Sequence, residues 1–184
     1  EIGTRGQYEF LAWDLSLYRS WIENEFIDLA NPDNGGNTSN TFNANDTVHQ
    51  GVEFGLDIHI EPAFLEQAGL RAVWRNIYTY SDFYFDDDPI AITQQNPDGV
   101  VFNFADNNLP AVPKHVYITE LRLEDPDKWY FGFNLRWIPE GPFIDYANTA
   151  EIPSYVLVGL TAGYDITDNI CLLYTSDAAD DEER

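Results

Sequence analysis

Apolar and polar side chains alternate along several long segments of this chain. In residues 129–137 every second position is large and apolar, and these positions are Trp129, Phe131, Phe133, Leu135 and Trp137. Residues 48–60 repeat the pattern, with charged, polar or small side chains between most of the apolar ones. A period of two is typical of a β-strand, because successive side chains point to opposite faces of the sheet. The sequence therefore predicts strands with one apolar and one wet face.

The pattern predicts seven strands, separated by connections of two lengths. The strands lie at about 1–6, 8–27, 45–60, 69–84, 115–124, 129–138 and 154–165. Short connections near 6–7, at 61–68 and at 125–128 alternate with long ones at 28–44, 85–114 and 139–153. The long connections are rich in Asn, Asp, Gly and Pro, which favour turns and solvated loops. Short turns on one rim and long loops on the other are typical of an outer-membrane barrel.

Strand length favours a membrane barrel over a soluble β-sandwich, which is the alternative fold. Sandwich strands usually have about five or six residues. Several segments here alternate over stretches close to the roughly 9–11 residues that cross a tilted membrane. No apolar run is long enough for a transmembrane helix. The sequence therefore predicts an all-β fold, an antiparallel up-and-down transmembrane β-barrel fragment with short periplasmic turns and long extracellular loops.

Two polar residues interrupt the predicted apolar faces. Arg19 follows Leu11, Trp13, Leu15 and Leu17 in the same register. It requires either a β-bulge or an interfacial position from which its long side chain reaches water. Asn76 is the second misfit, in the set formed by residues 70–80.

Composition and charge narrow the function. The chain of 184 residues is 15% aromatic, which suits strands with an apolar face, and its net charge of −23 argues against nucleic-acid binding. Residues 171–184 resemble a translated sequencing adapter, so we expect a barrel domain over 1–170 followed by a disordered, non-native tail. The alternative is a disordered acidic C-terminus. An exported protein needs a signal peptide and none is visible, so we expect the natural N-terminus to lie elsewhere.

Four segments resemble a known family. They are EIGTRG at 1–6, WDLSLYRSWIENE at 13–25, NANDTVHQGVE at 43–53 and LPAVPKH at 109–115. Together, in this order, they resemble the barrel of TonB-dependent outer-membrane receptors. The resemblance implies a barrel of about twenty-two strands closed by a plug domain. It also implies a Gram-negative outer membrane, a TonB complex that supplies force, and a scarce nutrient as cargo, typically a ferric siderophore. This chain contains neither the plug nor the TonB-contacting segment. The alternative function is that of a passive porin or structural barrel.

No grouping of residues predicts catalysis, a cofactor or a metal site. His49 and His59 share a strand face, but ten residues separate them by about 33 Å. Charges predicted to face the lumen mix both signs and are read as plug contacts and neighbour pairs; they are Glu53, Asp57, Arg71, Arg75, Glu120, Arg122, Glu124 and Arg136.

The long connections hold the other candidate residues. Asp86, Asp87 and Asp88 are hard oxygen ligands that could hold Ca²⁺, or they form a solvated acidic loop tip. Aromatic loop residues could form a ligand-contacting surface, or lie in the interfacial girdle. These candidates are Tyr84, Phe85, Phe102 and Tyr146. We expect no enzyme activity; the other expected partners are outer-membrane lipid and a small ligand such as a ferric siderophore.

Overall fold

The strands form where the two-residue period is longest, and each pairs with a neighbour along the chain. The computed structural model describes residues 1–30, 39–43, 46–86, 104–167 and 169–179. Its main sheet has eight antiparallel strands in up-and-down order. They are β1 (Ile2–Tyr8), β2 (Leu11–Ile22), β5 (Thr47–Ile60), β6 (Arg71–Phe85), β7 (His115–Asp125), β8 (Trp129–Ile138), β9 (Tyr155–Thr167) and β10 (Ile170–Ala179). A separate two-stranded sheet contains β3 (Phe26–Ala30) and β4 (Ser39–Asn43), and α1 spans Ala63–Gln67.

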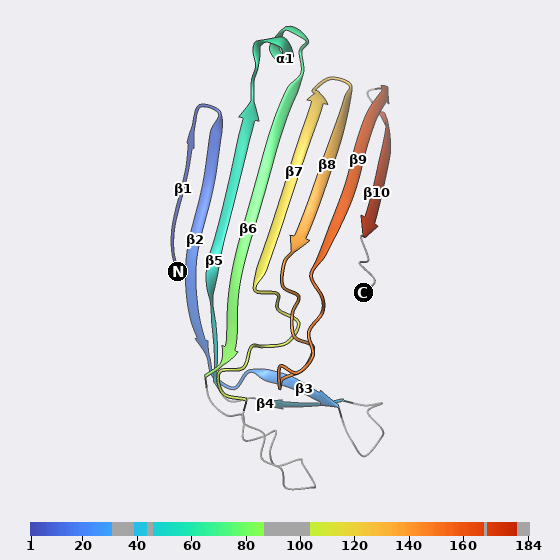
Figure 1. Cartoon of the computed structure of the whole chain (residues 1–184). Coiled ribbons are helices and arrows are strands. Elements are labelled where there is room, and N and C mark those ends of the chain that lie inside the picture. Colours follow the sequence, from blue (N-terminus) through green and yellow to red (C-terminus); the bar gives the residue numbers. More distant parts are fainter. Residues whose placement is uncertain (31–38, 44–45, 87–103, 168, 180–184) are drawn as a thin grey trace, which may run out of the picture.

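Figure 1 shows the eight strands side by side, with the short turns at one end of the sheet and the long connections at the other. We call these the short-turn end and the loop end. The helix α1 lies at the short-turn end, whereas β3 and β4 lie across the loop end (Figure 1). Within the described ranges no helix is long and apolar enough to span a membrane, and α1 has five residues.

The pairing registers bring the alternate apolar residues of all strands to one face. One row of opposite residues runs through Leu15, Phe54, Tyr78, Tyr117 and Trp137, on β2, β5, β6, β7 and β8. Residues opposite one another in an antiparallel pair share a face of the sheet. We call this the apolar face and the opposite side the polar face. The predicted all-β, up-and-down barrel-type sheet is confirmed.

The apolar face is not covered by another layer in the part of the chain that the structure describes. Phe131 and Leu121 each expose 47% of their surface, and Trp74 exposes 43%. In a β-sandwich such residues would face a second sheet. The buried apolar cluster that the structure does contain lies at the loop end and comprises Phe85, Phe104 and Leu109. The apolar face of the strands is therefore separate from the buried apolar cluster, as in the wall of a barrel.

Several strand boundaries and one connection differ from the sequence prediction. The expected strand at 8–27 ends at Ile22, because Asn24 adopts a left-handed backbone with φ of 56° that cannot continue a strand. The chain then enters the separate hairpin β3–β4. The connection at 61–68 contains α1, and the first strand extends to Tyr8 before a turn at Glu9, whose φ is 46°.

The expectation of disorder after residue 170 was wrong for most of that segment. Residues 170–179 form β10, which pairs with β9 through a register shift between Ile170 and Cys171. Leu172 and Tyr174 lie opposite Tyr164 and Ala162, so the segment continues the apolar face. Two-residue alternation is enough to add a strand at an open edge. Residues 180–184 lie outside the described ranges, and the non-native origin of 171–184 stays a prediction.

Candidate functional site

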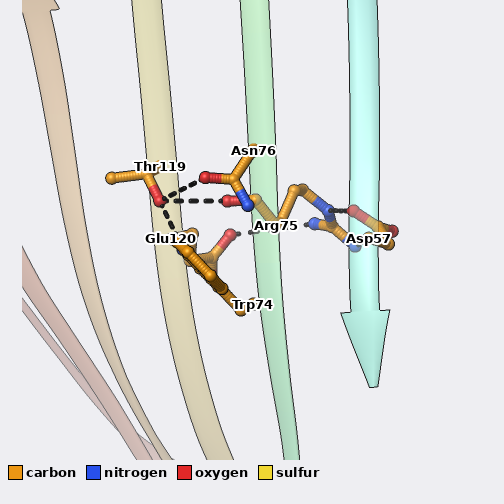
Figure 2. A network of polar contacts seen from close by, with 6 residues as sticks. All are labelled: Asp57, Trp74, Arg75, Asn76, Thr119 and Glu120. Carbon is orange, nitrogen blue, oxygen red and sulfur yellow. Dashed lines mark hydrogen bonds and ion pairs between the residues drawn. The ribbon is translucent and has the colours of Figure 1, made fainter. Parts of the chain in front are cut away.

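An ion-pair row crosses the polar face at the middle of the sheet. Asp57 on β5, Arg75 on β6 and Glu120 on β7 occupy directly opposite positions. Arg75 Nε lies 3.0 Å from Asp57 Oδ1, and its Nη1 lies 3.7 Å from Glu120 Oε2 (Figure 2). The Arg75 side chain is half exposed, so each pair contributes at most about 1 kcal/mol. The predicted pairing of inward charges is found here.

A second charged group lies on the polar face nearer the short-turn end. Arg122 Nε lies 2.9 Å from Glu124 Oε2, and its guanidinium carbon lies 4.1 Å from the centre of the Tyr130 ring. The ring lies over Gly163, where a Cβ atom would overlap it. Glycine at this position therefore lets Tyr130 lie flat beneath Arg122. The polar face therefore contains a stack of packed side chains.

The apolar face contains a closed polar cluster around Asn76, the residue that interrupts the sequence pattern. Tyr117 and Thr119 donate hydrogen bonds of 2.6 and 3.0 Å to the Asn76 side-chain oxygen. Trp74 Nε1 donates to Thr119 Oγ1 at 2.8 Å, as Figure 2 shows. Asn76 is only 8% exposed. Because an unpaired polar group costs free energy in apolar surroundings, this mutual bonding explains why asparagine is tolerated.

Arg19, the other interruption, is not accommodated by a bulge. β2 and β5 pair without a register shift from Leu11, opposite Ile58, to Ile22, opposite Thr47. Arg19 is exposed, and its guanidinium carbon lies 4.8 Å from the centre of the Trp21 ring. The sequence offered a β-bulge or an interfacial position. The structure favours the second, with Arg19 on the apolar face near the loop end.

At the loop end, the polar face holds a cluster around His49. The His49 ring stacks on Phe83, with centroids 4.2 Å apart, and its Nε2 lies 3.1 Å from Glu25 Oε2. The Thr47 hydroxyl also contacts the Glu25 carboxylate. Glu25 thereby ties the segment after β2 to the start of β5. Sequence reasoning considered His49 only with His59, and this partner lies too far along the chain for any local pattern to indicate it.

Two long connections are joined above the sheet. Asn148 accepts a 2.7 Å hydrogen bond from the Asn108 N–H and donates a 3.0 Å bond to the Asn108 carbonyl. Asn107 Nδ2 donates to the Tyr146 carbonyl oxygen at 2.8 Å. The Tyr146 ring lies 5.9 Å from Phe85 and 6.4 Å from Phe104, centre to centre. The two connections therefore share one small aromatic core.

Asp145 closes the second of these connections. Its carboxylate accepts hydrogen bonds from the backbone N–H groups of Thr149 and Ala150 and from the Thr149 hydroxyl. Mainly through the Ala150 N–H, these bonds lower the pKa of the Asp145 carboxyl below its ordinary value of 3.8. Asn148 lies inside the turn with φ of 54°, a backbone that asparagine tolerates well. This turn sets the position of Tyr146.

The structure separates the predicted ligand-contacting residues. Phe85 is fully buried and packs with Phe104 and Leu109, and its role as a ligand-contacting residue stays a prediction. Tyr146 packs against the same cluster, and Tyr84 forms an isolated β-bridge with Asn108. Phe102 lies outside the described residues. Phe104, which the sequence analysis did not single out, is an aromatic residue that packs against Phe85 in this cluster.

The described residues contain no group of three or more His, Cys, Asp or Glu side chains placed to hold a metal ion. Of the predicted acidic run, Asp86 is described and its N–H donates to the Asp46 carbonyl oxygen at 2.9 Å. Asp87 and Asp88 lie outside the described residues, so the Ca²⁺ alternative stays a prediction.

A comparison with protein families gives a match that spans nearly all of the chain. The family model described as "TonB dependent receptor-like, beta-barrel" matches residues 1–176. This family implies an outer-membrane barrel that functions in TonB-dependent transport, together with a plug domain, TonB and small ligands as partners. It is a family of receptors and transporters rather than an enzyme class.

Proposed function

The chain belongs to the TonB-dependent receptor β-barrel family, and on that premise we propose that it forms part of the wall of an importer for ferric siderophores. The observation that carries the proposal is the division of the sheet into two faces. The apolar face has no protein cover in the described part of the chain, whereas the polar face carries ion pairs. In this proposal the apolar face contacts the outer-membrane bilayer and the polar face lines the lumen.

Orientation follows from the connections. Outer-membrane barrels have short turns on the periplasmic side and longer loops outside the cell. The short-turn end therefore faces the periplasm, and the loop end, with the joined connections around Asn108 and Asn148, faces the medium. The ligand would meet the loop end first, where Tyr84, Tyr146 and Phe102 are the proposed contacts. Phe85 supports this surface from below because its own side chain is buried.

The plug domain of the receptor is the proposed neighbour of the polar face. Arg75 and Arg122 already have carboxylate partners within the sheet. Arg136 lies between Ile118 and Leu157 on neighbouring strands and has no ion pair within the described residues. A guanidinium in such a position is available to a carboxylate on the plug. Arg136 is therefore a proposed plug contact that has no competing ion pair within the described part of the sheet.

The proposal is tested by uptake in cells that carry or lack the full-length receptor. Radiolabelled iron is supplied as a ferric hydroxamate, a ferric catecholate or ferric citrate. The expected result is that loss of the receptor abolishes uptake of one chelate, and that loss of TonB abolishes the same uptake. Uptake that persists without TonB, or that depends on solute size alone, would instead identify a passive porin. Unchanged uptake of all three chelates would reject siderophore import.

A further inference from the structure

A row of polar residues crosses the apolar face near the loop end. Arg19 on β2, Gln50 on β5 and Asp82 on β6 occupy opposite positions in the pairing registers. The next row toward the short-turn end contains Leu17, Val52 and Tyr80. The row beyond it contains Trp21, Val48 and Tyr84, so the polar residues interrupt the apolar face at one level across three strands. Arg19 is part of this row and not an isolated exception.

The depth of this row fits a membrane interface. Eight residues separate Leu11 from Arg19 along the unbroken strand β2, which is about 26 Å of strand. At the tilt of about 40° found in such barrels, this corresponds to about 20 Å across the bilayer, close to the apolar band of about 25 Å. Aromatic residues lie just inside the row, as they do at membrane interfaces. They include Tyr78, Tyr80, Tyr117 and Trp137.

The charges in the row are not equivalent. Asp82 accepts a 2.7 Å hydrogen bond from Gln50 Nε2, and its other oxygen lies 4.0 Å from Lys114 Nζ. Its charge is therefore already compensated. Arg19 has no ion pair within the described ranges, and its guanidinium lies over the exposed ring of Trp21. Stacking on the ring leaves the edge N–H groups free to donate hydrogen bonds.

We propose that Arg19, stacked on Trp21, binds the phosphate of an anionic lipid headgroup in the outer leaflet of the membrane. This inference relies on the membrane orientation proposed above but not on the siderophore cargo. At the depth of Arg19, the anions of an outer membrane are phosphates attached to lipid. A guanidinium forms two parallel hydrogen bonds with phosphate oxygens. Because Arg19 is exposed and has no carboxylate partner within the described ranges, its guanidinium is available to such a phosphate.

The test measures lipid binding by native mass spectrometry of the full-length receptor, purified in detergent. The probe is lipid A, a phosphorylated glycolipid, and the comparison lipid is the same glycolipid without its phosphates. The unmodified receptor is expected to bind lipid A about tenfold more tightly than the dephosphorylated form, the size expected for a charge-assisted contact. This arm needs no variant, so it does not depend on the folding of a mutant protein.

Three variants assign the effect to Arg19. Arg19→Gln is expected to lower the affinity for lipid A to that for the dephosphorylated lipid, whereas Arg19→Lys retains most of the difference. Arg5→Gln is the matched control, because it removes an arginine from the same sheet but from the polar face. It is expected to leave lipid binding unchanged. Heat-modifiable migration on gels verifies that each barrel is folded.

The proposal is overturned if Arg19→Gln binds lipid A as the unmodified receptor does, or if Arg5→Gln weakens binding equally. Equal binding of the two lipids would also overturn it. Complete displacement of lipid A by an equal concentration of inorganic phosphate would identify a free-anion site instead. Because iron uptake is not measured, failure of the importer proposal would not be confused with failure of this one.

Discussion

The phenol of Tyr117 donates a 2.6 Å hydrogen bond to the side-chain oxygen of Asn76 across two strands of the apolar face. Because both groups lie where neighbours are apolar, the bond satisfies polar atoms that would otherwise remain unpaired. Tyr117→Phe leaves Thr119 as the remaining donor to Asn76, so we expect a loss of about 1 kcal/mol in the free energy of unfolding. Urea unfolding of the receptor in lipid vesicles measures it.

A double-mutant cycle separates the hydrogen bond from the individual side chains. Asn76→Leu alone leaves the Tyr117 hydroxyl without its acceptor and should cost about 1–3 kcal/mol. Asn76→Leu combined with Tyr117→Phe should cost less than the sum of the single changes, because both partners are then apolar. Strict additivity of the two losses would show that the bond does not contribute to stability.

Gly163 and Gly55 form a matched pair for testing close packing on the polar face. A Cβ atom at residue 163 would overlap the Tyr130 ring, whereas at Gly55 its nearest neighbours would be Asp14 atoms 3.9 Å away. We expect Gly163→Ala to lower the free energy of unfolding by about 1–3 kcal/mol, and Gly55→Ala to change it by less than about 0.5 kcal/mol. Tyr130→Ala in the Gly163→Ala background should restore part of the loss. Equal effects of the two alanines would contradict the packing role of Gly163.

The Asp57–Arg75–Glu120 row predicts a salt-dependent contribution to stability. Arg75→Gln removes both ion pairs, and because Arg75 is half exposed, the expected loss is at most about 1–2 kcal/mol at low salt. The difference from the unmodified protein should shrink in about 1 M NaCl, where the screening length is about 3 Å. Arg5→Gln is the control, because Arg5 lies on the same face and has no ion pair within the described residues. A loss that is the same at both salt concentrations would rule out ion pairing as its cause.

Asp145 predicts acid sensitivity of the turn that positions Tyr146. Its folded-state pKa is lowered, chiefly by the Ala150 N–H, so the carboxylate favours the folded turn at neutral pH. This contribution is complete above the ordinary pKa of 3.8 and is lost as pH falls through the lower, folded value. Hydrogen exchange at Thr149 and Ala150, corrected for intrinsic rates, should therefore stay constant from pH 7 to about 5 and lose protection below about 4.

The Asp145→Asn variant provides the control for that titration. It keeps a side-chain oxygen as acceptor but has no charge to titrate, so its protection should be weaker and independent of pH in the same range. Protection that falls with pH equally in both proteins would assign the change to another group.

The strands and their two faces could be predicted from the sequence because each residue's position in the period determines its side. The period places Asp57, Arg75 and Glu120 on one face, and the registers of the strands make them direct neighbours. The hairpin β3–β4 could not be predicted in this way, because the break depends on the backbone of a single residue, Asn24. The strand β10 was missed because its acidic end outweighed its short alternation.

The loop end was less predictable than the strands for a physical reason. Asn108 and Asn148 are 40 residues apart, yet they form two reciprocal hydrogen bonds. Contacts of this kind depend on how two irregular connections fold back on each other, and no local period indicates them. The burial of Phe85 follows from the same association, because Tyr146 reaches it from the other connection. Residue types suggested aromatic recognition there, but only the three-dimensional arrangement separates supporting rings from exposed ones.

All fourteen residues of β5 pair in register with β6. Deleting one residue from the middle of such a strand would turn every later side chain to the opposite side, which would place Glu53 or Asp57 in hydrocarbon. Insertions and deletions should therefore be harmful within the strands and tolerated in the long connections. Over evolutionary time, receptors built on this sheet can acquire new surfaces outside the cell while the length of each membrane crossing stays fixed.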